Sequence, residues 1–163
     1  MARPETLVVV HPGSACGSAD FNLGEDAADA ARARLSRAIE EWDGPVAVVD
    51  GELSDELLAY TDLDRTIRDA LARAGRRGAR VKACDAAGET HLAAGRVADA
   101  LQLDPACDAM VVTGCWFDPK DGWGCVNEVA RGFREMGFEA RVDETSAVAE
   151  ASDDYADAPG FKA

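Results

Sequence analysis

The chain has 163 residues, 47% of them hydrophobic, which is enough to bury the core of one domain and excludes an intrinsically disordered polymer. Its 31 acidic residues outnumber 17 basic ones, so the net charge is −14, which argues against nucleic acid and anionic membranes as partners. The acidity is explained more simply by solubility, including solubility in high salt, than by a cationic substrate. No apolar run approaches the ~18 residues of a membrane helix, and Leu7–Val10 is too short for a signal-peptide core. We therefore expect a cytoplasmic protein.

The five cysteines do not form a disulfide pattern. Their number is odd and their spacing irregular, at positions 16, 84, 107, 115 and 125. Without an export signal, the sequence predicts free thiols in a reducing compartment.

Strand and helix patterns alternate along the chain. Short apolar runs predict strands, and apolar residues at helical spacing predict helices between them. The predicted strands are 7–10, 46–49, 79–84, 109–113 and 138–142. The predicted helices are 25–42, 63–74, a helix to residue 101 that Thr90 caps, and one after Gly124 that ends at Gly137.

This alternation predicts a doubly wound α/β domain, with a mostly parallel sheet in the order 3-2-1-4-5 and helices on both faces. The domain is expected over residues 1–145. The acidic, poorly periodic segment 146–163 is expected to be a tail, partly disordered or docked on a neighbouring chain. Ligands of such sheets bind beyond the carboxyl ends of the strands, here 11–24, 50–54, 82–91, 113–125 and 143–146.

Two residues near this edge are suited to covalent chemistry. Cys125 falls where the last helix should begin, and the helix dipole there lowers a thiol pKa and favours the thiolate. Backbone N–H groups at the same helix end can stabilise an oxyanion. Lys82 is expected at the end of strand three, where its charge can hold a thiolate or a carbonyl, or form an ordinary salt bridge.

The loop after the first strand offers two candidate bases. It is rich in small residues and contains His11 and Asp20, either of which could accept a proton. Its glycines lack the Gly-Lys-Ser/Thr ending of a phosphate loop, so a nucleotide cofactor is not expected.

The order of these motifs resembles the isochorismatase-like cysteine hydrolases. The likeness rests on Lys82 with its following helix, Val111-Val-Thr-Gly114, Cys125-Val126 and Val142-Asp143, and is best over residues 79–148. It implies a parallel sheet between helices, and a triad of a strand-one carboxylate, the lysine and the cysteine. It also implies hydrolysis of C–N bonds in small amides or ureido compounds, or of vinyl ethers. His11 stands where the carboxylate is expected, and Asp20 follows nine residues later.

The sequence thus predicts a cysteine hydrolase acting on a small amide-like substrate without a cofactor. Cys125 is the predicted nucleophile and Lys82 its electrostatic partner. Asp20 is favoured over His11 as the base, and His11 is expected to orient or bind. Cys115, Trp116 and Trp123 flank an enlarged loop that is expected to bind substrate, as a lid or as a contact in a homo-oligomer.

Two other classes of protein remain open. One is a catalytically inactive relative that serves as a small-molecule-binding or assembly subunit. The other is a metal or redox protein that uses the cysteines with His11 and His91, although no closely spaced ligand pair of a structural zinc site is present, and no metal ligand is assigned.

Overall fold

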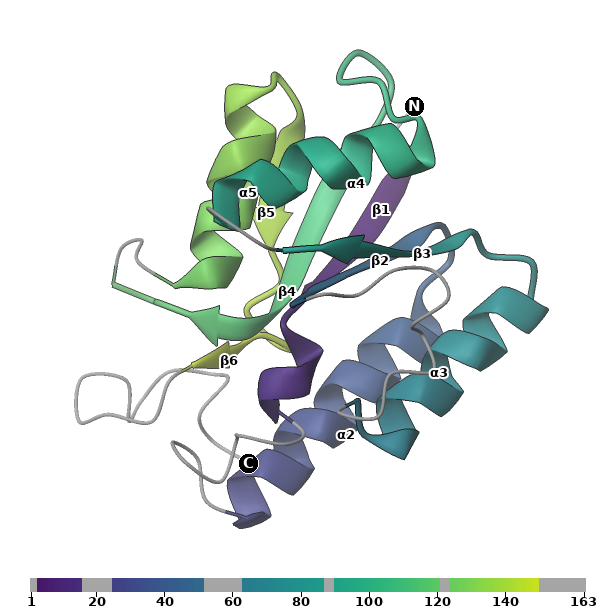
Figure 1. The fold of residues 1–163 in the computed structure, drawn as a ribbon, viewed down its shortest axis with the longest axis vertical. Coiled ribbons are helices and arrows are strands. Elements are labelled where there is room, and N and C mark those ends of the chain that lie inside the picture. Colours follow the sequence, from purple (N-terminus) through teal and green to yellow (C-terminus); the bar gives the residue numbers. More distant parts are fainter. Residues whose placement is uncertain (1–2, 16–24, 52–62, 87–89, 121–123, 150–163) are drawn as a thin grey trace.

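The computed structural model describes residues 3–15, 25–51, 63–86, 90–120 and 124–149 (Figure 1). Its strands form one parallel sheet in the order β3-β2-β1-β4-β5, as the sequence predicts. The strands are β1 (Glu5–Val10), β2 (Val46–Asp50), β3 (Val81–Asp85), β4 (Ala109–Phe117) and β5 (Glu139–Val142), and a short β6 (Val148–Ala149) pairs with β4.

Helices cover both faces of the sheet, which makes the fold Rossmann-like. α2 (Glu25–Glu41) and α3 (Arg65–Arg76) pack on one face, and α4 (Ala93–Leu101) and α5 (Cys125–Glu135) on the other (Figure 1). Two short 3-10 turns, η1 (Pro12–Ala15) and η3 (Thr90–Leu92), follow β1 and β3. The predicted three-layer α/β class is therefore confirmed.

The central strand explains why two helical layers are needed. In β1, Val8 and Val10 join the core under α4 and α5, whereas Leu7 and Val9 join the core under α2 and α3. Successive side chains of a strand point to opposite faces, so an unbroken apolar run such as this requires cover on both sides. The same register aligns the carboxyl ends of β1 and β2.

Two predicted strand boundaries are wrong. β3 runs from Val81 to Asp85 because its last residues pair with the end of β2, so Lys82 is the second residue of the strand and not its end. β4 continues four residues past Thr113, to Phe117. Gly114 makes this extension possible at a φ of +111°, since a Cβ there would lie 2.1 Å from the carbonyl oxygen of Val10.

The fold also extends past the expected start of the tail. Residues 146–149 are buried, and the Ser146 hydroxyl hydrogen bonds to the hydroxyl of Thr113 at 2.7 Å and to the carboxylate of Asp143 at 2.6 Å. The rest of the predicted tail, residues 150–163, lies outside the described residues.

Candidate functional site

His11 follows β1 directly, at the carboxyl edge of the sheet. Its N–H donates to the carbonyl oxygen of Val49 at 2.6 Å, which extends the β1–β2 ladder by one bond. Its φ of +45° is one that residues other than glycine rarely adopt. Such backbone strain persists only where the surroundings hold it, and it is concentrated at functional sites.

Asp50, the last residue of β2, holds the His11 ring. The Nδ1 atom of His11 lies 3.2 Å from Oδ1 of Asp50. The same carboxylate accepts the N–H of Gly13 at 2.8 Å and the N–H of Gly51 at 2.9 Å. A Cβ on Gly13 would lie 2.7 Å from Oδ2 of Asp50, so the glycine is needed for this contact.

Cys125 is the first residue of α5, as the sequence predicts. A Cβ on Gly124 would lie 2.1 Å from the carbonyl oxygen of Trp116, so this glycine allows the start of the helix to meet the end of β4. Asn127 strengthens the junction: its Oδ1 accepts the N–H of Asp118 at 2.8 Å and its Nδ2 donates to the carbonyl of Asp118 at 3.1 Å.

Thr90 approaches Cys125 from the other side. It begins η3, which lies against α5 because Gly132 has no side chain; a Cβ there would be 2.6 Å from the carbonyl oxygen of His91. The predicted role of Thr90 as a helix cap is wrong, since Leu92 is the N-cap of α4 and makes no side-chain cap bond. The Thr90 side chain hydrogen bonds to Cys125 instead.

The side chains of His11 and Cys125 form a hydrogen bond that shifts both pKa values. Burial lowers the pKa of His11, but the hydrogen bonds to Asp50 and Cys125 outweigh it and raise the pKa to about 9. The hydrogen bond from His11 lowers the pKa of Cys125, with a further contribution from Thr90, against opposing effects of burial and of Glu128. Both shifts favour a thiolate beside an imidazolium.

Asp50 is the third titratable residue of the cluster with Cys125 and His11. Burial would raise its pKa, but hydrogen bonds from His11, Gly13 and Gly51 lower it, so the carboxylate stays ionised. The exposed fractions of the His11 and Asp50 side chains are only 21% and 19%, so water screens their interaction weakly. A nucleophile next to a base that a third group orients is the arrangement of covalent hydrolases.

The backbone of Lys82 lies at an earlier level of the sheet than this cluster. Lys82 pairs with Ala47 of β2. Val10, the residue before His11, is aligned with Val49 of β2, which in turn pairs with Cys84 of β3. Lys82 therefore lies three residues earlier along the sheet, or about 10 Å at ~3.3 Å per residue. Lys82 therefore does not stand at the end of β3, and its role as the electrostatic partner of Cys125 stays a prediction.

Two of the predicted substrate-binding residues, Cys115 and Trp116, belong to β4. Cys115 is fully buried in the core under α2 and α3, and Trp116 packs against that same core. Cys125 packs against the core on the opposite face. Cys115 is thus buried and Trp116 half-buried on the face of the sheet opposite Cys125, and their role in substrate binding stays a prediction. Asp20 and Trp123 lie outside the described residues.

Sequence reasoning did not single out Asp50. Its signal was present: Asp50-Gly51 follows the second strand, and His11-Pro-Gly13 follows the first. In the predicted strand order these two strands are neighbours, so their carboxyl ends had to meet. The likeness to a family with a strand-one carboxylate instead drew attention to Asp20.

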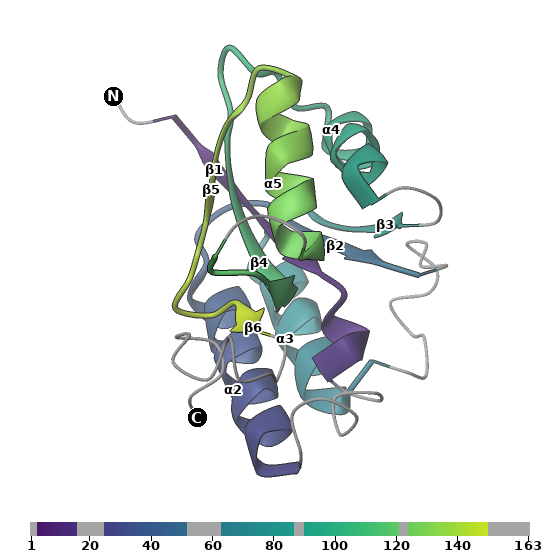
Figure 2. The ribbon, with the colours of Figure 1, turned by 90° about the vertical axis from the view of Figure 1, so that its left-hand side faces the viewer.

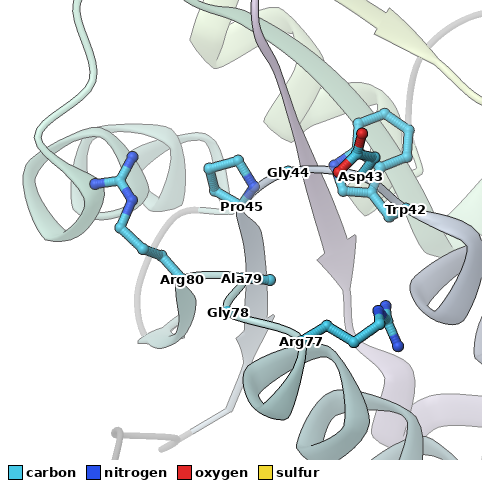
Figure 3. Close-up of a pocket in the computed structure, with 8 residues that line it drawn as sticks. All are labelled: Trp42, Asp43, Gly44, Pro45, Arg77, Gly78, Ala79 and Arg80. Carbon is cyan, nitrogen blue, oxygen red and sulfur yellow. The ribbon is translucent and has the colours of Figure 1, made fainter.

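A separate pocket of about 240 Å³ lies at the amino end of β2 and β3, next to Trp42, Gly44 and Pro45 (Figure 3). Its two arginines point in different directions and contact helix ends. Arg77 donates to the carbonyl of Ile39 at 3.3 Å, and Arg80 donates to the carbonyl of Leu101 at 2.9 Å. These bonds satisfy carbonyls in the last turns of α2 and α4, which indicates a structural role.

Within the described parts of the chain, no three His, Cys, Asp or Glu side chains are grouped so as to hold a metal ion. The same residues contain no helix that is both long and apolar enough to cross a membrane.

The fold and this cluster define a Rossmann-like α/β domain with Cys125, His11 and Asp50 at the carboxyl edge of its sheet. The sequence matches no protein-family model and no curated protein. Among solved structures, it is similar to the crystal structure of glucose-6-phosphate 1-dehydrogenase from Mycobacterium avium, with 16% identity and a TM-score of 0.46. The match covers 86% of this chain but only 29% of the dehydrogenase, and we base no inference on it.

Proposed function

We propose that this protein is a cysteine hydrolase that cleaves a C–N bond in a small amide-like substrate through a covalent intermediate on Cys125. The observation that supports this most is that His11 hydrogen bonds to both Cys125 and Asp50. The proposal agrees in class with the resemblance to isochorismatase-like hydrolases, but the base is His11, oriented by Asp50, in place of a strand-one carboxylate.

In the first half of the reaction, the Cys125 thiolate attacks the carbonyl carbon of the amide and forms a C–S bond. The carbonyl π electrons move to oxygen. The N–H groups in the first turn of α5 can stabilise that oxyanion, because the first N–H groups of a helix have no partner within it. The His11 imidazolium then gives its proton to the departing nitrogen. The C–N bond breaks, the amine leaves and a thioester remains.

In the second half, neutral His11 takes a proton from water as the water oxygen attacks the thioester carbon. The tetrahedral intermediate collapses, the C–S bond breaks and the acid is released. The thiolate and the imidazolium are both restored, so the cycle needs water and no redox partner. Asp50 keeps Nδ1 of His11 engaged, which leaves Nε2 as the ring nitrogen for proton transfer in this mechanism.

The test compares two thiols of different exposure in one protein. Cys107 is exposed and Cys125 is only partly so. If exposure alone controlled reactivity, iodoacetamide would label Cys107 first. If His11 activates Cys125, peptide mapping at pH 7 will find Cys125 labelled first, and His11→Gln will reverse the order.

Turnover is then followed with a panel of small primary amides and N-carbamoyl amines by ammonia or amine release. Intact mass should reveal an acylated protein that Cys125→Ala cannot form. If Cys125 is labelled first but no amide is cleaved or captured, the activated thiol stands and hydrolysis is refuted, which leaves the binding-subunit alternative. Slow labelling of Cys125 in the wild type contradicts the nucleophile itself.

A further inference from the structure

A groove of about 520 Å³ lies on the outer side of α5, between the β4–α5 connection, α5 and the end of β5. Figure 2 shows α5 and β5 side by side above this connection. The charged side chains that line the groove are Asp118, Lys120, Arg131, Arg134, Arg141 and Glu144. Its volume lies within the ~300–1,000 Å³ range of small-molecule pockets.

The charge of this groove is opposite to that of the chain. Four basic side chains and two acidic ones line the groove, so basic residues predominate there in a protein whose net charge is −14. Lys120 is one of only three lysines in the sequence. A gathering of basic residues against the general charge favours a local anionic ligand, whereas the overall negative field repels a long polyanion.

The groove is separate from the candidate active site. Asn127, Arg131 and Arg134 are spaced four and three residues apart and share one face of α5. Asn127 is about 200° around the helix from Cys125, at ~100° per residue. A molecule in the groove therefore lies behind the helix, away from the thiol and His11.

Two of the arginines contact other parts of the protein. Arg134 donates through Nε to the carbonyl of Ala140 at 3.0 Å, and Nη2 of Arg141 lies 3.5 Å from the carboxylate of Glu5. A guanidinium has five N–H donors, and the Nε bond of Arg134 uses one of them. The planar guanidinium group matches the oxygens of a phosphate group by paired hydrogen bonds.

We propose that this groove binds a small phosphate-bearing molecule, with Arg131 and Arg134 on one side and Lys120 and Arg141 around the anion. The site is independent of the proposed hydrolysis, since it uses neither Cys125 nor His11. It would add a regulatory or second-substrate site to the domain.

The test measures binding of inorganic pyrophosphate and inorganic phosphate by isothermal titration calorimetry, with ionic strength held constant by sodium chloride. The wild type should bind pyrophosphate at one saturable site. The double variant Arg131→Gln/Arg134→Gln should weaken binding at least tenfold. The matched control is Arg65→Gln/Arg76→Gln on the exposed side of α3, which removes the same charge far from the groove and should change affinity less than twofold.

Lys120→Gln leaves α5 unchanged and should weaken binding about threefold, so it tests the proposal even if the double variant does not fold. Equal losses in the groove and control variants would mean that only overall charge matters, and would overturn the site. Absence of saturable pyrophosphate binding by the wild type would also overturn it. Neither outcome bears on the labelling of Cys125.

Discussion

The two ends of the parallel sheet use polar residues in different ways. At the amino end, Arg77 and Arg80 each donate to a backbone carbonyl in the last turns of a helix. At the carboxyl end, His11 and Asp50 bond to each other, and His11 also bonds to Cys125. Polar side chains that hydrogen bond to backbone carbonyls stabilise a fold. Titratable side chains that hydrogen bond to one another shift their pKa values and become suited to catalysis.

The direction of the strands explains the difference. In a parallel sheet the carboxyl ends of neighbouring strands all lie at one edge, and the residues that follow them face the first turns of the next helices. His11, Asp50 and Cys125 come from β1, β2 and the helix after β4, which are adjacent in this sheet. The comparison predicts that substitutions at the carboxyl edge change chemistry more than stability, and that those at the amino edge do the reverse.

Removal of the nucleophile should have the largest effect. Cys125→Ala is expected to lower amide turnover by about 10³-fold or more, because no other group forms the covalent bond. The measurement is product release under saturating substrate. Cys107→Ser, which removes an exposed thiol far from the site, is the control and should keep full activity. Retained turnover in Cys125→Ala would contradict the assignment of covalent chemistry to the carboxyl edge of the sheet.

Replacement of the base should have the second-largest effect on turnover, and it should also change the pH dependence of Cys125 alkylation. His11→Gln is expected to slow turnover by about 10²- to 10³-fold. The pKa of Cys125 lies below its usual value mainly because of His11, so the wild-type thiol should alkylate rapidly at neutral pH and slow down only as acid protonates the thiolate. In His11→Gln the midpoint of the alkylation profile should move to higher pH. Stopped-flow alkylation between pH 5 and 10 measures this, and an unchanged midpoint would contradict the ion pair.

Displacement of the positioning carboxylate should have a smaller effect. Gly13→Ala places a Cβ 2.7 Å from Oδ2 of Asp50, so the carboxylate has to turn away from the His11 ring. We expect turnover to fall about tenfold to a hundredfold with little change in KM, because the base remains but loses its orientation. The pKa of His11 should drop from about 9, since one of the bonds that raise it is weakened. Histidine NMR titration follows that shift.

A control distinguishes positioning from general destabilisation. Gly75→Ala is also a glycine-to-alanine change, in α3, where a Cβ meets no atom within 4 Å. It should leave turnover and the His11 titration unchanged. If Gly13→Ala and Gly75→Ala change turnover and the His11 titration equally, the contact between Gly13 and Asp50 does not contribute to catalysis.

The sequence was sufficient for the strand order and for the place of Cys125, because apolar periodicity and the glycine before the helix are local signals. It was not sufficient for the strand position of Lys82, since β3 continues for three residues past it by pairing with β2, and no local pattern marks that end. Trp116 was expected in an exposed loop. Instead β4 continues through Gly114, which has a positive φ, to Phe117, so Trp116 belongs to the strand and is half-buried. Asp50 was missed because its importance depends on a contact with His11, 39 positions earlier.

The smallest effect is expected at the amino edge, and it is the one that most directly tests the contrast. Arg80→Gln removes the donor to the carbonyl of Leu101, which should cost about 1 kcal/mol and lower Tm by about 2–4 °C. Arg77→Gln should cost less, because its bond to Ile39 is longer, at 3.3 Å. In both variants iodoacetamide should alkylate Cys125 at the wild-type rate, because the amino and carboxyl ends of the sheet are separated by the length of the strands. Thermal unfolding by circular dichroism and iodoacetamide kinetics on the same samples provide the two readouts. A slower Cys125 in Arg80→Gln, at unchanged Tm, would mean that the amino edge takes part in the chemistry and that the division between a structural and a reactive edge is wrong.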